Sequence, residues 1–259
     1  MIKFYSARGC TLSHIYIKTL FSIENGIETT TQITASELRQ NIVPFVGSCH
    51  LIVSLNKRHE NNVNDAAVIY KNHTKDCYFC YEFIVRSPNV IQYRRSDCQI
   101  APLSGNISSL CSLISTIELE TGFVQNREDA SDFNCKSIIE GVYAFDYRIV
   151  GSTGVCSSPN SIIKACQRQG SPLRDNSVFT QTYGYCPDFQ DISATEDPNI
   201  VYGKANIWRC YGRWVDKDGS IWAAIEYDTN QPKLKFRCMT TRIDQQNPDD
   251  SIHWAYFPR

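Results

Sequence analysis

Cys77 and Cys80 have the spacing in this sequence that is best suited to chemistry, because two cysteines three positions apart can supply half of a zinc site or a redox-active disulfide. A zinc site needs a second such pair, which the sequence lacks, and the nearest histidine, His73, belongs to a glycosylation sequon. A thioredoxin-like site needs alternating strands and helices, which the neighbouring sequence does not predict. We therefore expect Cys77 and Cys80 to begin two structural disulfides on one strand.

Other catalytic and metal-binding patterns are not formed. His59-Glu60 is not followed by a second histidine at the metalloprotease spacing, and residues 151–154 (Gly-Ser-Thr-Gly) fit neither a nucleophile elbow nor a phosphate loop. Glu118 and Glu120 lie in a polar stretch, where we expect them to be solvated. A glycosidase can assemble its two acids from distant strands. The sequence nevertheless offers no catalytic residue, cofactor-binding residue or metal ligand, and we expect no enzymatic activity.

The cysteine content indicates an oxidised framework. An even number of cysteines spread along a chain is typical of extracellular disulfide-bonded proteins, whereas cytosolic proteins keep few thiols. We expect all twelve to form disulfides: Cys10, Cys49, Cys77, Cys80, Cys98, Cys111, Cys135, Cys156, Cys166, Cys186, Cys210 and Cys238. Two glycosylation sequons, at Asn72 and Asn106, agree with passage through the secretory route. The expected location is extracellular, either as a secreted protein or as the ectodomain of a membrane protein.

The N-terminal residues do not form a convincing signal peptide. His14 and Lys18 interrupt the apolar stretch at 11–23, and no clear small-residue cleavage site follows. No apolar run reaches the 18 residues that a transmembrane helix needs. We interpret the chain as an excised ectodomain fragment, with or without a membrane span elsewhere in its parent protein.

Composition and charge exclude several classes of partner. Of the 259 residues, 42% are hydrophobic, which is enough for a buried core, and the net charge is −1. A balance this close to neutral gives no general attraction to nucleic acid or acidic membranes. Lys57-Arg58 and Arg94-Arg95 are too short to form a nucleic-acid patch, so we expect no nucleic-acid partner.

The hydrophobic pattern predicts strands with one or two short helices. Thr34 and Glu37 can form a capping box before a helix at 38–42, and a second short helix is expected at 108–115. Segments rich in β-branched and aromatic residues predict strands at 45–55, 66–71, 78–85 and 90–95, the last two joined by a turn at 87–89. Further strands are expected at 141–150, 161–167, 177–185, 207–215, 220–227, 234–241 and 253–257.

Short strands at this spacing favour antiparallel sandwiches or barrels. We therefore predict a mainly β protein with two disulfide-bonded domains that are sandwich-like or barrel-like. Residues 118–134 are polar and make the best boundary. The expected division is an N-terminal segment (1–20), a first cysteine-rich domain (21–117), a linker (118–134) and a second cysteine-rich domain (135–259).

The segment 207–227 is the clearest hairpin, with Asp218-Gly219 supplying the positive φ of a tight turn. Strand alternation places Trp208, Cys210, Gly212 and Trp214 on one face, opposite Arg209, Tyr211 and Arg213. Cys238 falls on the apolar face of a nearby strand, so a Cys210–Cys238 disulfide is a reasonable hypothesis. The aromatic side chains of this hairpin either belong to the core, which we favour, or line a ligand cavity: Trp208, Tyr211, Trp214 and Trp222.

Two blocks of the chain resemble consecutive modules of uncharacterised cysteine-rich invertebrate proteins, which are secreted or span a membrane once and carry domains of unknown function in tandem. In the first block the resemblance rests on Cys77-Tyr-Phe-Cys80, Arg86-Ser-Pro-Asn-Val-Ile-Gln-Tyr-Arg94 and Cys98. In the second it rests on Cys156-Ser-Ser-Pro-Asn-Ser-Ile-Ile-Lys-Ala-Cys166, Trp208-Arg-Cys210-Tyr-Gly-Arg-Trp214 and Lys235-Phe-Arg-Cys238. It covers about residues 21–242 and implies an extracellular setting without implying an activity.

We therefore expect a non-enzymatic pair of ectodomain modules that binds an unidentified protein at the cell surface or in the matrix, or that serves as a structural spacer. The alternative is a lipocalin-like carrier of a small apolar ligand, suggested by the Gly-x-Trp element Gly212–Trp214 in a series of strands. That element lies far from the N-terminal strand where lipocalins carry it. An enzyme is the third hypothesis.

Overall fold

The computed structural model describes residues 10–24, 27–41, 47–58, 63–100, 107–124, 141–148, 154–165, 178–187, 202–216, 219–227, 236–243 and 252–257. The chain divides into two compact units, Met1–Phe133 and Asn134–Pro258. Both are built from antiparallel strands, so the mainly β, disulfide-bonded prediction is confirmed. Each unit is described by itself below.

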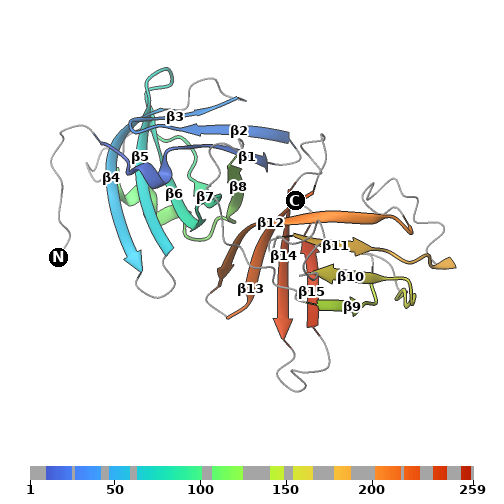
Figure 1. The fold of residues 1–259 in the computed structure, drawn as a ribbon. Helices are drawn as coiled ribbons and strands as arrows, with labels where there is room; N and C mark the ends of the chain where they lie inside the picture. The colour runs from blue at the N-terminus through green and yellow to red at the C-terminus, as the bar shows by residue number, and fades with distance from the viewer. Residues whose placement is uncertain are drawn as a thin grey trace. The chain divides into compact units, whose positions relative to one another are not determined.

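The first unit is a closed eight-stranded barrel (Figure 1, blue to green). Its strands are β1 (Lys18–Glu24), β2 (Ile27–Ile33), β3 (Glu37–Gln40), β4 (Gly47–Arg58), β5 (Val63–Asn72), β6 (Cys77–Ser87), β7 (Val90–Arg95) and β8 (Glu120–Val124). Each strand pairs with the next along the chain, and β8 pairs with β1 through Leu20–Val124 and Phe21–Phe123. The sheet therefore has no free edge.

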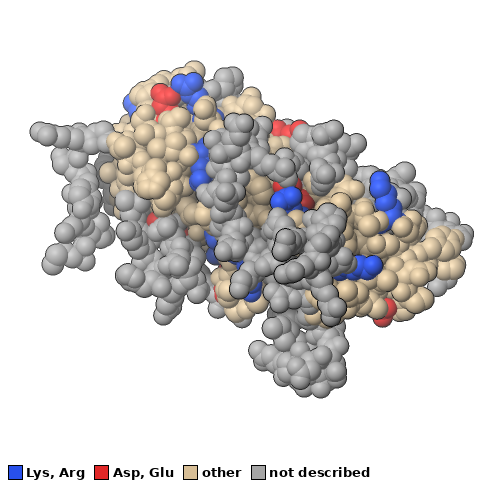
Figure 2. Space-filling view, viewed as in Figure 1, with Lys and Arg blue, Asp and Glu red and all other residues tan. Residues whose placement is uncertain are grey.

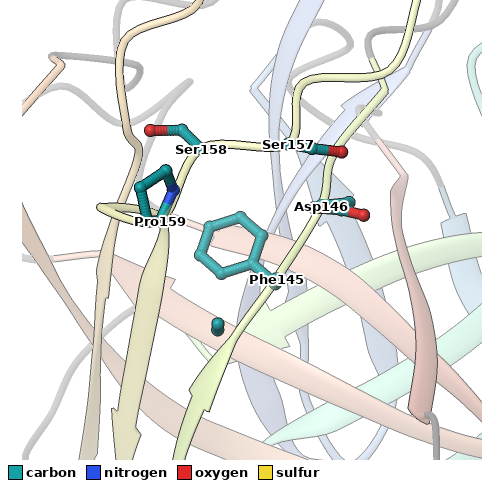
Figure 3. Close-up of a pocket in the computed structure, with 6 residues that line it drawn as sticks. Phe145, Asp146, Ser157, Ser158 and Pro159 are labelled. Carbon is teal, nitrogen blue, oxygen red and sulfur yellow. The ribbon is translucent and has the colours of Figure 1, made fainter.

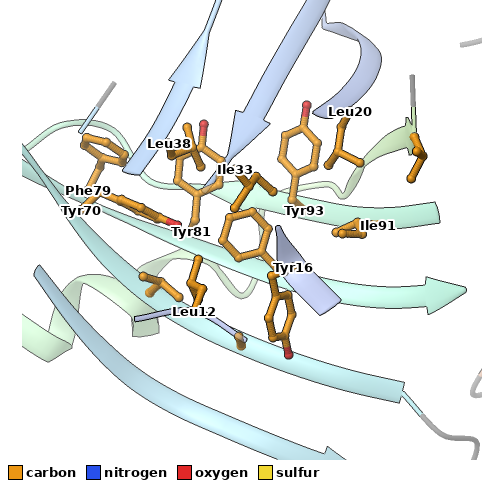
Figure 4. Close-up of a cluster of buried hydrophobic side chains, with 14 residues drawn as sticks. Leu12, Tyr16, Leu20, Ile33, Leu38, Tyr70, Phe79, Tyr81, Ile91 and Tyr93 are labelled. Atoms are coloured by element: carbon orange, nitrogen blue, oxygen red, sulfur yellow. The ribbon is translucent and has the colours of Figure 1, made fainter. Parts of the chain in front are cut away.

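Large aromatic side chains fill the barrel interior. Alternate residues of a strand face the same side, and in β6 the inward positions include Phe79, Tyr81 and Phe83. The ring centroids of Tyr81 and Phe83 are 5.4 Å apart and their planes are 15° from parallel. The cluster is drawn in Figure 4 and comprises Leu12, Tyr16, Leu20, Ile33, Leu38, Ala66, Val68, Tyr70, Phe79, Tyr81, Phe83, Ile91, Tyr93 and Val124.

The N-terminal stretch belongs to this barrel, not to a separate segment ending at residue 20. A 3-10 helix, η1 (His14–Tyr16), precedes β1, and its Tyr16 ring lies 6.3 Å from that of Phe83. The N–H of Leu12 donates to the carbonyl of Ala35 at 2.9 Å, in the turn between β2 and β3. Of the apolar residues in the stretch 11–23, Leu12, Tyr16 and Leu20 are therefore core residues of the first unit.

The Thr34–Glu37 motif forms a β-turn region and not the expected helix. The Thr34 hydroxyl accepts the N–H of Glu37 at 2.9 Å, as a helix cap would, but the N–H of Thr34 also donates to the carbonyl of Glu37. The Thr34 hydroxyl also donates to the Glu37 carbonyl at 3.1 Å, so three hydrogen bonds between these residues close the connection between β2 and β3. Leu38 is buried in the core between half-buried Glu37 and exposed Arg39, so tertiary packing selects a strand where the local motif is also compatible with a helix.

The stretch 118–134, expected to be a linker, contains β8. Ile91–Gly122 and Tyr93–Glu120 pair this strand with β7, and Phe123 is fully buried. A five-residue strand needs few large apolar residues, and its polar surroundings concealed it in the sequence. The second predicted helix is present as η2 (Ile107–Ile114), a 3-10 helix in the β7–β8 connection. Of the helices described, none is long and apolar enough to span a membrane.

The second unit contains a seven-stranded antiparallel sheet (Figure 1, yellow-green to red). Its strands are β9 (Gly141–Ala144), β10 (Ile162–Ala165), β11 (Val178–Thr182), β12 (Ala205–Val215), β13 (Ile221–Tyr227), β14 (Phe236–Ile243) and β15 (Ile252–Phe257). They follow one another in the sheet in chain order and match the strands predicted from residue 141 onward. In the β12–β13 turn, Gly219 has φ +83° and donates its N–H to the carbonyl of Asp216 at 3.0 Å, as its Asp-Gly sequence predicts.

The Cys210–Cys238 disulfide hypothesis is wrong. Cys210 is disulfide-bonded, but Cys238 carries a thiol. Strand β13 lies between their strands, with Ile225 opposite Cys210 and Ala224 opposite Cys238. Two strand spacings place the Cα atoms about 10 Å apart, beyond the reach of about 7 Å for a disulfide. Consecutive residues of β13 also face opposite sides, so the two cysteine side chains do not point toward each other.

Candidate binding surface

The disulfides fix the expected framework in both units. In the described residues they join Cys10–Cys49, Cys77–Cys98, Cys80–Cys111 and Cys156–Cys186. As predicted, Cys77 and Cys80 begin two bridges on one strand. Cys80 also packs with Leu110 and Ile114, so its bridge holds η2 against the barrel wall. The partner of Cys210 is outside the described residues, as are Cys135 and Cys166.

The two sequons differ in what the structure describes. Asn72 ends β5 with 6% of its surface exposed, and its Oδ1 accepts the N–H groups of Thr74 at 3.0 Å and Lys75 at 3.1 Å. These bonds make it the organising residue of the β5–β6 turn. Asn106 lies outside the described residues.

A corner in the second unit, held by a disulfide and backbone hydrogen bonds, carries several exposed apolar side chains. The corner begins where β9 ends, and the N–H of Phe145 donates to the carbonyl of Ser161 at 3.1 Å. Tyr147 and Cys156 then exchange both backbone hydrogen bonds, at 2.8 and 3.0 Å. The Cys156–Cys186 bridge ties this pair to the segment that follows β11. Three stretches far apart in sequence are therefore held together covalently and by backbone hydrogen bonds.

Gly184 allows the closest approach in this corner. A Cβ at this position would overlap the side chain of Ser158, so only glycine fits. Its N–H donates to the Ser161 hydroxyl at 3.0 Å, and its carbonyl accepts the Tyr147 hydroxyl at 2.9 Å. Every backbone polar group of Gly184 is thus used to join the corner's segments.

Aromatic rings support the corner from inside. The rings of Phe145, Tyr147 and Tyr183 lie 5.1–6.1 Å from one another, and Tyr183 meets both neighbours edge to face. Burial, followed by the hydrogen bond with Tyr202, raises the pKa of Tyr147 far above its usual value. Tyr147 is therefore a neutral hydrogen-bond donor at physiological pH, with a structural role at this position.

A shallow pocket of about 400 Å³ opens beside the end of β9. Figure 3 shows the Phe145 ring between the strand and the Ser157–Pro159 segment. The pocket is lined by Ala144, Phe145, Asp146, Ser157, Ser158 and Pro159. Asp146 is the charged residue of this set. The Ser158 hydroxyl accepts the N–H of Asn160 in a turn, so it already has a structural partner.

Exposed apolar side chains occur on the segments beside this pocket. Val142 and Tyr143 of β9 are 63% and 38% exposed, Val155 is 49% exposed and Tyr185 is 53% exposed. Tyr185 is held edge to face against Tyr202, with ring centroids 5.5 Å apart. We call Val142, Tyr143, Val155 and Tyr185, together with the pocket, the corner surface, in which the consecutive residues Val142 and Tyr143 face opposite sides of β9. Among the described residues in Figure 2, lysine and arginine are scattered between acidic residues and do not gather in one patch.

Comparison with protein families finds two domains of unknown function in tandem. Residues 8–116 match the family model described as domain of unknown function DUF7044. Residues 133–256 match that described as domain of unknown function DUF7042. The expected tandem of uncharacterised domains is present. No curated protein and no solved structure matches the chain.

The aromatic residues singled out in the sequence are mostly core residues and not a site. Trp208, Tyr211 and Trp214 are buried, and Trp222 stacks on Trp214 with ring centroids 6.3 Å apart. The predicted alternation holds except at Tyr211, where a β-bulge between Cys210 and Gly212 changes the pairing of β12. The corner surface was not found from the sequence. Cys156 and Cys186 mark its segments, but their pairing cannot be deduced from sequence.

Proposed function

We propose that the chain is an extracellular, non-enzymatic pair of disulfide-bonded β modules that binds another protein through the corner surface. The observation that carries this proposal is the exposure of two valines and two tyrosines on segments beside a pocket, two of these segments being joined by a disulfide. Apolar side chains exposed on neighbouring segments, tyrosine among them, occur at protein interaction sites.

Rigidity supports a binding role for this surface. Ordering flexible side chains and loops upon association costs free energy, and a surface that is already ordered avoids part of that cost. The Cys156–Cys186 bridge and the bonds of Gly184 order the corner before any partner arrives. Four disulfides in the described residues support the extracellular location, because disulfides persist in oxidising compartments.

The test is a screen of native cell surfaces with the full chain, secreted from eukaryotic cells and displayed as a multivalent probe. We expect saturable binding that a Tyr185→Asp, Val155→Asp double variant loses. The matched control is Ile100→Asp, because Ile100 is 82% exposed in the first unit. Circular dichroism should show all variants folded. Absence of any saturable partner would overturn the proposal, and equal loss in the Ile100→Asp control would remove the corner surface from it.

A carrier of a small apolar ligand is the second candidate. A closed barrel of eight strands in chain order is the architecture of such carriers. Its wall also holds buried polar groups, including the Ser22–Tyr93 hydroxyl pair at 2.8 Å and the Gln40 amide, which donates to Thr31 at 3.0 Å. The aromatic cluster fills the interior, however, which weighs against a large ligand. Native mass spectrometry of the secreted chain tests it: a stoichiometric small molecule supports a carrier, and a bare mass rejects it.

A further inference from the structure

Strand β9 is the last strand of its sheet within the described part of the chain, and its free side is suited to pairing with another strand. All four of its residues are exposed. The bond from Phe145 N–H to the Ser161 carbonyl sets the alternation of the β9–β10 ladder. In an antiparallel ladder, residues alternate between hydrogen-bonding toward and away from the neighbouring strand. The N–H and C=O groups of Val142 and Ala144 therefore point away from β10.

Natural proteins protect edge strands by keeping them short or with lysine, proline, bulges or inward-pointing charges. β9 is short, with four residues, but has none of the other protective features. The sequence of β9 is Gly-Val-Tyr-Ala, which contains no charge and no proline, and its pairing with β10 is regular over all four residues. An edge of this kind, next to exposed apolar side chains, fits recognition by strand addition. In that mode, main-chain hydrogen bonds supply affinity and an adjacent pocket supplies specificity.

The pocket at the end of β9 has the chemistry of a site for a basic side chain. The Phe145 ring and the Pro159 ring supply apolar surface against which a lysine or arginine stem can pack. Asp146 supplies a carboxylate and Ser157 a hydroxyl. No ion pair or hydrogen bond holds the Asp146 side chain within the described residues, so its charge is available. A guanidinium or ammonium group can meet the Asp146 carboxylate, which points away from the Phe145 ring in Figure 3.

We propose that β9 receives an extended segment of a partner protein as an added strand, and that the pocket takes a lysine or arginine side chain from that segment. This inference rests on the proposed protein-binding function and names the class of ligand. Side chains two positions apart on a strand share a face. Val142 lies two positions before Ala144 and is largely exposed, so the ligand residue two positions from the basic one contacts Val142 and is apolar.

The experiment is selection of a random decapeptide display library on the full, oxidised chain. The expected result is enrichment of extended peptides with a basic residue and an apolar residue two positions away. The affinity of the selected peptides should fall roughly three- to tenfold in Asp146→Asn, because the charge pair is partly exposed. The matched control is Asp97→Asn, since Asp97 is exposed in the first unit and its side chain has no role in this surface. It should leave affinity unchanged.

Backbone pairing is tested in the peptide, which leaves the protein intact. N-methylation of alternate peptide residues removes hydrogen-bond donors on one side of the strand, and one of the two alternation patterns should abolish binding while the other preserves it. Selected peptides without basic residues, or insensitivity to Asp146→Asn and to both methylation patterns, would overturn the inference. If the library yields no binding peptide but the cell-surface screen finds a partner that requires the corner surface, strand addition is overturned and the proposed function stands. Failure of both screens would reject both.

Discussion

Asn72 illustrates how a residue with a modification signature acquires a structural role. Its Asn-His-Thr triplet satisfies the sequence rule for glycosylation. The folded chain places Asn72 at the end of β5, where its Oδ1 accepts two backbone N–H groups and its surface is 94% covered, since 6% is exposed. A side chain used in this way is poorly placed to carry a bulky glycan. The triplet can be recognised in the sequence, whereas burial depends on the turn and its neighbouring strands.

We therefore predict that Asn72 carries no glycan and stabilises its turn. In Asn72→Ala, the intact mass should show no loss of a glycan. The free energy of unfolding should fall by about 1–2 kcal/mol, because two turn hydrogen bonds are lost. Thr74→Val destroys the sequon without removing Oδ1, and should change neither the glycan mass nor stability appreciably. Intact mass and chemical denaturation measure both. Loss of a glycan in Thr74→Val would contradict the prediction.

Tyr16 makes the first unit sensitive to alkaline pH. Burial, with a smaller contribution from Asp65, raises the pKa of Tyr16 from 10.0 to about 12. The folded state therefore holds this proton more tightly than the unfolded chain. The resulting stability is present below pH 10 and is lost as the pH rises from about 10 toward 12.

We expect Tyr16→Phe to abolish this part of the alkaline destabilisation. The free energy of unfolding of the wild-type chain should fall relative to that of Tyr16→Phe between pH 10 and 11, by at most about 1.4 kcal/mol per pH unit for one proton. Urea denaturation at pH 9, 10 and 11 gives the comparison, and Tyr185→Phe serves as a control that removes an exposed phenol from the other unit. Parallel curves for wild type and Tyr16→Phe would refute the assignment.

The corner surface shows what residue patterns leave undetermined at a binding site. Val142 and Val178 are the same residue type, each in a strand segment that the sequence predicts, yet one is 63% exposed and the other 5% exposed. Their difference comes from where their strands lie in the sheet: β9 ends the sheet and β11 is inside it. Strand order depends on pairing between distant segments. The chemistry-bearing residues were visible in the sequence, but their exposure was not.

At the scale of elements, strands beside a strong turn motif could be predicted from the sequence, and strands with weak local signals could not. The β6–β7 and β12–β13 hairpins were predicted from Pro-Asn and Asp-Gly turns that fix both strands beside them. Strands β1, β2, β3 and β8 were missed. β3 is short and lies where a helix was expected, β8 is short and pairs with β1 about 100 residues away, and the seven-residue strands β1 and β2 were not recognised. Glu120–Val124 lies between the two family matches as well, since these cover 8–116 and 133–256.

β8 makes the boundary of the first unit testable. A fragment ending at residue 116 lacks β8, and should leave β1 and β7 unpaired on one side and expose the barrel core. A fragment covering 1–133 retains the strand and should fold. Circular dichroism melting and size-exclusion chromatography distinguish them: the longer fragment should be monomeric with a cooperative melt, the shorter one aggregated or without a cooperative transition. Equal behaviour of the two fragments would show that β8 is dispensable.

For the whole molecule, stability depends on the oxidised state. Loss of one native disulfide in a secreted domain typically costs about 2–5 kcal/mol, against a total stability of about 5–15 kcal/mol. We expect full reduction to unfold the chain near body temperature, because bridges are lost from both units together. Circular dichroism at 37 °C, with and without reductant, measures this. An unchanged spectrum after complete thiol exposure would show that the hydrophobic cores suffice.

The pairing of β1 with β8 also determines when the barrel can close during synthesis of the chain. β1 ends at Glu24 and β8 ends at Val124, so the ribosome must add about 100 residues after β1 before its second neighbour exists. At common elongation rates this takes roughly 5–20 s. The bridges Cys77–Cys98 and Cys80–Cys111 span 21 and 31 residues and can form earlier on the emerging chain. During that interval β1 presents an open strand edge, which is a site for incorrect pairing until the barrel closes.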